Sequence, residues 1–196
     1  MDFNTDIILD LEMPGVVFSR GEQVTLRTIE REDAGVIQRA RNEPAFQEGF
    51  LMETPKTKNM IEDYIEEVVE GDDDSINLLI CVDEEPVGAV SLLDMRRTHG
   101  MLHYWLLPDQ RGHGYATEGG ALLVDHGFET VGLHRIFAWT IDDNEASKAV
   151  LQRLGFTHEG TYREHLFTGG THHDAEHYGL LSSEWNGPKA IQKDHR

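Results

Sequence analysis

The sequence predicts an α/β (α+β) fold with a mostly antiparallel central sheet. Two periodicities alternate along the chain, since apolar residues recur at every second position in some segments and at every third or fourth in others. The expected elements follow the order strand, two helices, three strands, helix, strand, helix and two strands. This order lacks the regular strand–helix alternation of a doubly wound parallel sheet. The length of 196 residues fits one domain, because a typical domain holds about 100–200 residues.

The N-terminal part of the domain is expected to form one strand and two helices. The strand lies over 23–29, where apolar and polar residues alternate. The first helix lies over 30–41, with acidic residues in its first turn. The second helix lies over 56–70, because its apolar residues share one face at helical spacing: Met60, Ile61, Tyr64, Ile65 and Val68.

The remainder of the chain is richer in strands, which brings the expected total to about seven strands and about four helices. One helix is expected over 116–129, after a glycine-bearing loop, and another over 144–154, before Gly155. The six strands expected here lie over 76–82, 87–93, 101–107, 135–141, 161–167 and 176–183.

The charge of the chain excludes two classes of partner. It carries 36 acidic and 17 basic side chains, for a net charge of −19. Nucleic acids and anionic lipids require a basic surface, so neither a nucleic acid nor a membrane is an expected partner. Such a chain repels itself unless salt screens the charges. The composition therefore favours a halophilic-type acidic surface over that of an ordinary acidic cytosolic protein.

The N-terminal segment, the lengths of the apolar runs and the single cysteine indicate where the protein is expected to reside. Residues 1–20 are expected to be an N-terminal extension, and 21–196 a single domain. The extension has acidic residues where a leader would have basic ones, and no apolar run reaches the about 20 residues of a membrane span. We therefore expect a cytoplasmic protein. Cys81 lies between apolar residues and is expected to be a small buried hydrophobe.

The segment from Arg111 to Glu118 connects a predicted strand to a predicted helix and predicts an anion site. Free amide groups at a helix N-terminus bind phosphate, and Gly112 and Gly114 allow a ligand to approach the backbone. A P-loop is excluded, because the chain has no Gly-Lys pair. The loop does not match the dinucleotide-binding fingerprint G-x-G-x-x-G, because Thr117 stands where the third glycine should be. A nicotinamide-binding oxidoreductase stays as a weaker alternative, since the acidic Asp142 closes the next strand.

Two motifs, about 30 residues apart, resemble those of the GNAT acetyltransferases. The loop Arg111-x-x-Gly114-x-Ala116 resembles the acetyl-CoA pyrophosphate loop (R/Q-x-x-G-x-G/A), and the run 144–160 resembles the second motif (N-x-x-S…LGF…EG). Further positions resemble the RimJ/RimL-type branch, which includes protein N-terminal acetyltransferases: Leu26-Arg27, Gly169-Gly170, Asp174 and Tyr178. The resemblance covers about residues 23–185.

The resemblance implies a GNAT fold in which strand 102–107 splays from strand 135–141 in a V. Pantetheine would lie in the gap against backbone groups of one strand, and the pyrophosphate would lie on the loop amides with Arg111 adding positive charge. Asn144 would hydrogen-bond the pantetheine arm, or cap the following helix, or both. The implied acetyl-CoA-binding residues are Trp105, Leu106, Leu107, Arg111, Gly112, His113, Gly114, Tyr115, Ala116, Thr117 and Asn144.

The resemblance also implies direct attack of an amine on the thioester. In many members a tyrosine acts as the general acid at the position where this chain has Leu151. Ser147, at the position used by the RimJ/RimL-type branch, either donates to the leaving sulfur or serves helix solvation. Glu164 is a candidate base, because residues i and i+2 share a strand face and the usual carboxylate aligns with Leu166. His103 is a second candidate base. For both Glu164 and His103, an ordinary surface or packing role is the alternative.

The histidine-rich stretch 171–177 could suggest a metal, but neighbouring residues on a strand point apart, and we expect no metal site. The expected partners are acetyl-CoA and an amine acceptor, either a protein N-terminus or a small molecule, and acidic loops would attract a cationic acceptor. Trp139 and the final strand are candidates for a homodimer interface. The expected function is an N-acetyltransferase, with a non-catalytic CoA-binding sensor or scaffold of the same fold as the alternative.

Overall fold

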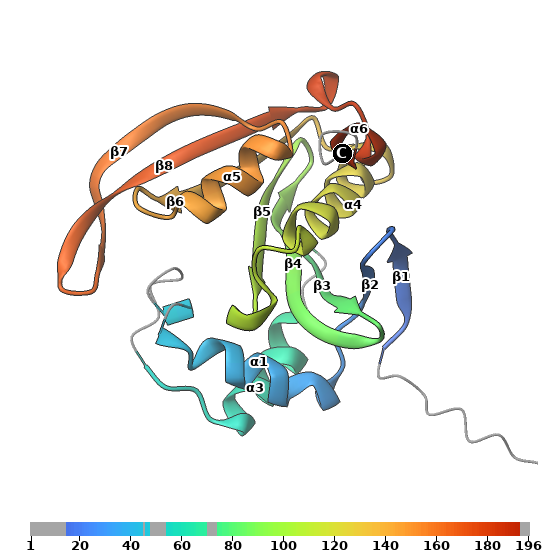
Figure 1. Cartoon of the computed structure of the whole chain (residues 1–196), viewed down its shortest axis with the longest axis vertical. Helices are drawn as coiled ribbons and strands as arrows, with labels where there is room; N and C mark the ends of the chain where they lie inside the picture. The colour runs from blue at the N-terminus through green and yellow to red at the C-terminus, as the bar shows by residue number, and fades with distance from the viewer. Residues whose placement is uncertain (1–14, 45, 48–53, 70–73, 193–196) are drawn as a thin grey trace, which may run out of the picture.

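The computed structural model describes residues 15–44, 46–47, 54–69 and 74–192, which form one mixed sheet flanked by helices (Figure 1). The eight strands lie in the order β1-β2-β3-β4-β5-β6-β8-β7. All neighbouring strands are antiparallel except β5 and β6, which run parallel. The mostly antiparallel sheet predicted from the sequence is therefore confirmed.

The elements occupy the following ranges. The strands are β1 (Val17–Arg20), β2 (Thr25–Thr28), β3 (Ile76–Val82), β4 (Glu85–Arg96), β5 (His99–Leu106), β6 (Arg135–Ile141), β7 (Thr157–Thr168) and β8 (Thr171–Leu181). The helices are α1 (Ala34–Arg41), α3 (Lys58–Tyr64), α4 (Tyr115–Glu129), α5 (Glu145–Arg153) and α6 (Pro188–Gln192), together with a π-helical turn over Ile65–Val69.

Two short elements were not predicted from the sequence. Strand β1 lies inside the range 1–20 that the sequence assigned to an extension, and it pairs with β2 as an edge strand. It has only four residues, and they alternate between half-buried and exposed, so its periodicity is weak. Helix α6 has five residues and packs against α4. The predicted helix over 56–70 is divided into α3 and the π-helical turn, and its expected end at residue 70 lies outside the described residues.

Both faces of the sheet are buried, and strand β3 shows why its sequence is continuously apolar. Leu78 and Ile80 belong to a core cluster beneath α4 and α5, whereas Leu79 and Cys81 belong to a second cluster beneath α1 and α3. Successive side chains of a strand point to opposite faces, so a strand covered on both sides needs apolar residues throughout. Cys81 is 1% exposed, which confirms that it packs as a buried hydrophobe.

A buried ion pair fixes the start of α1 against the sheet. Both terminal nitrogens of Arg27 donate to the carboxylate of Asp33, at 2.8 and 2.7 Å, and both side chains are nearly inaccessible. The same carboxylate accepts from the backbone N–H of Glu30 at 2.9 Å. A bidentate pair of this kind defines both distance and orientation, so it fixes where α1 crosses the sheet.

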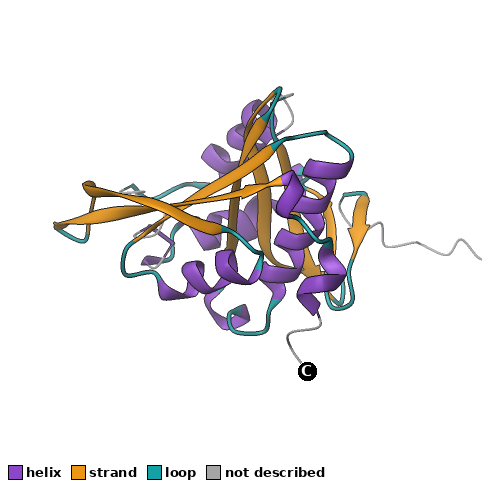
Figure 2. Ribbon diagram, turned by 90° about the horizontal axis from the view of Figure 1, so that it is seen from above, coloured by secondary structure: helices purple, strands orange, loops and turns teal. Residues whose placement is uncertain are grey.

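The sheet opens into a V between β5 and β6. The two strands pair over only three positions, from His99 with Arg135 to Met101 with Phe137. Beyond them, β5 continues to Leu106 and β6 to Ile141 without pairing to each other. This confirms the predicted splay. Seen from above, the β7–β8 hairpin projects from the body of the molecule (Figure 2). Among the described residues, no helix has the length and apolar character needed to cross a membrane.

Candidate active site

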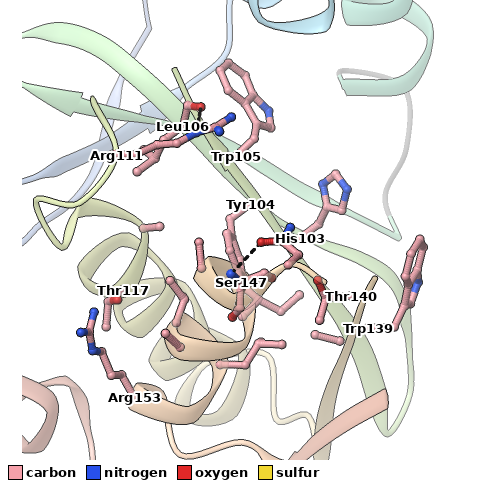
Figure 3. A pocket seen from close by; sticks show the side chains of 18 of the residues that line it. His103, Tyr104, Trp105, Leu106, Arg111, Thr117, Trp139, Thr140, Ser147 and Arg153 are labelled. Atoms are coloured by element: carbon pink, nitrogen blue, oxygen red, sulfur yellow. Dashed lines mark hydrogen bonds between the residues drawn. The ribbon is translucent and has the colours of Figure 1, made fainter. Parts of the chain in front are cut away.

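A cleft of about 460 Å³ opens where β5 and β6 separate, and Figure 3 shows most of the side chains that line it. One end of the cleft reaches the loop before α4, and its middle lies between β5 and α5. The lining also includes the aromatic rings of Phe46, Trp105 and Trp139. The sequence motifs and the V-shaped opening therefore lie at the same place in the structure.

The loop before α4 offers donors without acceptors. Gly112 and Gly114 adopt φ of 84° and 87°, in the left-handed region that favours glycine, and Gly114 is the N-cap of α4. The amide groups of residues 115–117 make no hydrogen bond within the described part of the chain, as is usual for the first turn of a helix. The hydroxyl of Thr117 is buried and also lacks a partner there. These groups, with the helix dipole, form a site for an anion.

Positive charge lies at the same end of the cleft. Arg111 is exposed, and its Nε donates to the carbonyl oxygen of Leu106 at 3.4 Å. Arg153, at the end of α5, lines the cleft as well and was not predicted from the sequence (Figure 3). Its spacing of seven residues from Ala146 was the available signal, because α5 turns one face of small residues toward the cleft at helical spacing. The donor set of this end suits a pyrophosphate group.

The backbone of β5 offers only part of the predicted contact surface. The N–H of Leu107 donates to the carbonyl oxygen of Val87 at 2.9 Å, so it faces β4 rather than the gap. Since backbone groups alternate along a strand, those of Trp105 also face β4, and those of Leu106 and Tyr104 face the gap. The N–H of Leu107 is therefore not free for the predicted cofactor contact, the backbone of Trp105 is turned the same way, and Leu107 is a buried core residue.

Asn144 begins α5 as its N-cap. Its Oδ1 accepts from the backbone N–H of Ser147 at 3.0 Å, and the residue lines the cleft. The capping role was one of the two roles predicted from the sequence, and it is confirmed. The cap also determines where Ser147 lies on the first turn of α5.

Ser147 forms a hydrogen-bonded pair with Tyr104, which the sequence analysis did not single out. The two hydroxyl oxygens are 2.8 Å apart, and the Tyr104 hydroxyl also lies 3.1 Å from the carbonyl oxygen of Ser147 (Figure 3). Burial raises the pKa of Tyr104, so its phenol stays neutral and can donate a hydrogen bond. The signal for Tyr104 was strand alternation, since it shares a face of β5 with Leu102 and Leu106.

The two candidate bases lie in different environments. His103 lines the cleft, and burial, with a smaller contribution from the charge of Arg41, lowers its pKa to about 4. It is therefore a neutral and weakly basic imidazole at neutral pH. Glu164 is exposed, has a positive φ of 50° and is not among the residues that line the cleft.

The argument that placed Glu164 in the site is wrong, because it assumed an unbroken strand. The register of β7 against β8 shifts between Tyr162 and Leu166, so alternation does not carry across this segment. Leu166 is buried and Glu164 is exposed, although they are two residues apart. The backbone N–H of Glu164 donates to Asp174 at 2.7 Å, which holds the bulge against β8.

The histidine-rich hairpin brings one titratable cluster together outside the cleft lining. Asp142, Asp143 and His173 place their ligand atoms within 4.8 Å of one another. Nδ1 of His173 lies 3.1 Å from the carboxylate of Asp142, so a hydrogen bond joins these two members of the cluster. His177 packs its ring on exposed Tyr162, with centroids 4.0 Å apart, and Tyr178 is buried in the core.

Comparisons with known proteins agree with this geometry. The model of the acetyltransferase (GNAT) domain family matches residues 23–157. A putative ribosomal N-acetyltransferase of Bacillus subtilis, YdaF, is 36% identical over 104 residues, which cover 52% of this chain and 57% of that protein. The chain thus matches little more than half the length of this curated relative.

Two solved structures share the fold. The RimL ribosomal L7/L12 α-N-protein acetyltransferase, in complex with coenzyme A, matches with a TM-score of 0.78 and 18% identity, covering 85% of this chain and 98% of that one. The spermidine N-acetyltransferase of Vibrio cholerae, in complex with CoA and spermine, matches with a TM-score of 0.77 and 21% identity, covering 84% and 98%. At these identities the likeness concerns the fold.

Proposed function

Because the chain belongs to the GNAT acetyltransferase family, we propose that it is an acetyl-CoA-dependent N-acetyltransferase that transfers an acetyl group to a primary amine. The observation that supports this most strongly is the V-shaped gap, where β5 and β6 pair over three positions and then separate beside an anion-binding loop. The gap leaves room for an extended pantetheine arm. The proposal includes two types of acceptor, a protein N-terminal α-amine and a small-molecule amine.

The residues that would hold acetyl-CoA fit its chemical groups. The pyrophosphate is anionic and suits the free amides of residues 115–117, the unpartnered hydroxyl of Thr117 and the guanidinium groups of Arg111 and Arg153. The pantetheine arm carries amides, and these would pair with the backbone groups of Tyr104 and Leu106 that face the gap. A thioester at the end of the arm would then lie near Ser147.

The proposed reaction forms a C–N bond and breaks the C–S bond of the thioester. The amine nitrogen attacks the carbonyl carbon, and an N–H of β5 that faces the gap and is not paired with the pantetheine arm would stabilise the oxyanion. Ser147 would donate a hydrogen bond to the leaving thiolate, while the neutral phenol of Tyr104 donates to the Ser147 hydroxyl and orients it. The nitrogen loses a proton to water, since His103 is too weak a base at neutral pH.

The test is turnover with acetyl-CoA and a panel of amines, with free thiol as the readout. An acetyltransferase releases thiol only when an acceptor is present. Binding of acetyl-CoA without thiol release from any acceptor would instead favour a non-catalytic CoA-binding sensor. Competition with NADH addresses the oxidoreductase alternative, because tight NADH binding would contradict the assignment of the loop.

A further inference from the structure

We propose that the acceptor is a monoamine, whose single amino group is attached to an apolar group and which brings no second cationic centre into the cleft. This inference rests on the proposed function and narrows it. It concerns the part of the cleft on the α1 and α3 side of the sheet, called the acceptor side below. The shared chemistry fits both a free apolar amine and the α-amine of a chain that begins with an apolar residue.

The two faces of the sheet assign this side of the cleft to the acceptor. Tyr104 and Leu106 pack with the core cluster on the side of α4 and α5, where the anion-binding loop and Ser147 also lie. Trp105 packs on the opposite side, against Phe46, with ring centroids 5.7 Å apart. By alternation His103 shares the face of Trp105. If acetyl-CoA occupies the first side, the acceptor reaches the thioester from the second.

The acceptor side is aromatic and apolar. Its lining includes the rings of Phe46, Trp105 and Trp139 and the aliphatic side chains of Leu93 and Met101. In Figure 3 the rings of Trp105 and His103 extend away from Ser147 and Tyr104, and Trp139 extends along the other strand of the V. A lining of this kind binds an apolar group through contact area rather than through charge.

Carboxylates are absent from the described lining of the cleft, although the chain as a whole has a net charge of −19. The charged residues in that lining are Arg111 and Arg153, both at the loop end. On the acceptor side, the guanidinium of Arg41 acts on His103 and lies 3.8 Å from the ring centroid of Tyr64. Within the described lining, a second ammonium group would meet no carboxylate partner, which is costly in an apolar site.

The sequence led to the opposite expectation, that acidic loops would attract a cationic acceptor. The described carboxylates lie outside the cleft lining, where they affect the approach of a cation but do not pair with it in the bound state. Specificity is a difference between bound states. The inference therefore separates this chain from an enzyme that selects polyamines, such as the spermidine N-acetyltransferase that shares its fold.

The decisive experiment compares butylamine with 1,4-diaminobutane, which differ only in the second amino group, by kcat/KM for thiol release. We expect butylamine to be the better acceptor by about tenfold or more. Equal or reversed values would overturn the inference, as would acetylation of spermidine in preference to butylamine. Adding 2-phenylethylamine and an uncharged peptide with an apolar first residue distinguishes a free amine from a chain terminus.

A pair of variants tests the charge argument on the acceptor face. Trp139→Glu introduces a carboxylate there, and Trp139→Gln removes the same ring without adding charge. We expect Trp139→Glu to shift the preference toward 1,4-diaminobutane by about tenfold relative to Trp139→Gln. An identical preference in both variants would overturn the inference.

Failure of this inference differs from failure of the proposed function. If acetyl-CoA binds, by calorimetry, and no amine or peptide releases thiol, the acetyltransferase assignment itself is wrong, and the inference with it. If diamines are acetylated and monoamines are not, the acetyltransferase assignment stands and only the inference is wrong.

Discussion

The two sides of the sheet at the V differ in what they offer a ligand. On the side of α4 and α5, the cleft presents free amides, small side chains and two arginines. On the side of α1 and α3, it presents aromatic rings and a neutral histidine. The first side suits an extended anionic carrier, and the second suits an apolar group with an amine at its end.

Strand alternation produces this difference within three consecutive residues. His103 and Trp105 point to the aromatic side, and Tyr104 between them points to α5 and Ser147. A splayed strand thus supplies both half-sites and keeps them a fixed distance apart. Opening the sheet thus creates one cleft with two chemically distinct linings.

The largest effect is expected from Gly114→Glu, which acts on the anion-binding side alone. The substitution adds a negative charge at the N-terminus of α4 and strains a residue with φ of 87°, so acetyl-CoA binding should be abolished. Calorimetric titration with acetyl-CoA measures the loss.

Gly132→Glu is the matched control for this prediction. Gly132 has φ of 79°, is exposed and has no atom within 4 Å of an added Cβ. Gly132→Glu therefore introduces the same backbone strain and the same negative charge as Gly114→Glu, but at a position that does not line the cleft. The control should retain binding. Unchanged affinity in Gly114→Glu would contradict the assignment of the loop.

The next effect belongs to the aromatic side, where His103 couples folding to pH. Its pKa is about 4 in the folded protein and about 6.5 when unfolded, so the unfolded chain binds the extra proton between these values. Stability should therefore fall as pH decreases from 6.5 to 4, by up to about 3 kcal/mol from this group.

His103→Asn should flatten that part of the stability profile, as measured by urea unfolding at several pH values. His134→Asn, at an exposed position, should keep the slope of the parent protein. A parent slope that survives in His103→Asn would show that the imidazole is not held neutral by the fold.

A smaller effect is expected from the hydroxyl pair that faces the cofactor side. Ser147→Ala and Tyr104→Phe should each lower kcat by about tenfold, while acetyl-CoA affinity stays nearly constant, because each removes one hydrogen bond of the proposed thiol-release step. The double variant should resemble the single ones, since the two hydroxyls act as a unit. Full additivity, or full activity in Ser147→Ala, would remove the pair from the proposed mechanism.

The smallest effect separates the charge of the surface from that of the cleft. Molar KCl screens the self-repulsion of a chain with a net charge of −19, so Tm should rise by a few degrees, the shift expected for about 1–2 kcal/mol. The same salt should weaken acetyl-CoA binding, because it screens Arg111 and Arg153. A flat thermal response would mean that the acidic surface gives no adaptation to salt.

The sequence predicted much of this arrangement because the strongest signals are local. The strand before Arg111, the glycine loop and the cap at Asn144 depend on residues close together in the chain, and each was found where it was expected. The bulge near Glu164 was missed because its cause lies across the hairpin, where Asp174 holds the backbone of β7. Tyr104 was missed because its partner is 43 residues away.

The amino-acid sequence was enough to predict most of the strands and helices, the glycine loop before α4 and the capped start of α5, because backbone preferences and side-chain periodicity act over a few residues. The three-dimensional structure was needed to show that the N–H of Leu107 faces β4 and that Tyr104 meets Ser147. Those outcomes depend on which strands lie side by side and in what register. Register fixes the direction of every amide and side chain along a strand, and it is set by packing across the whole sheet.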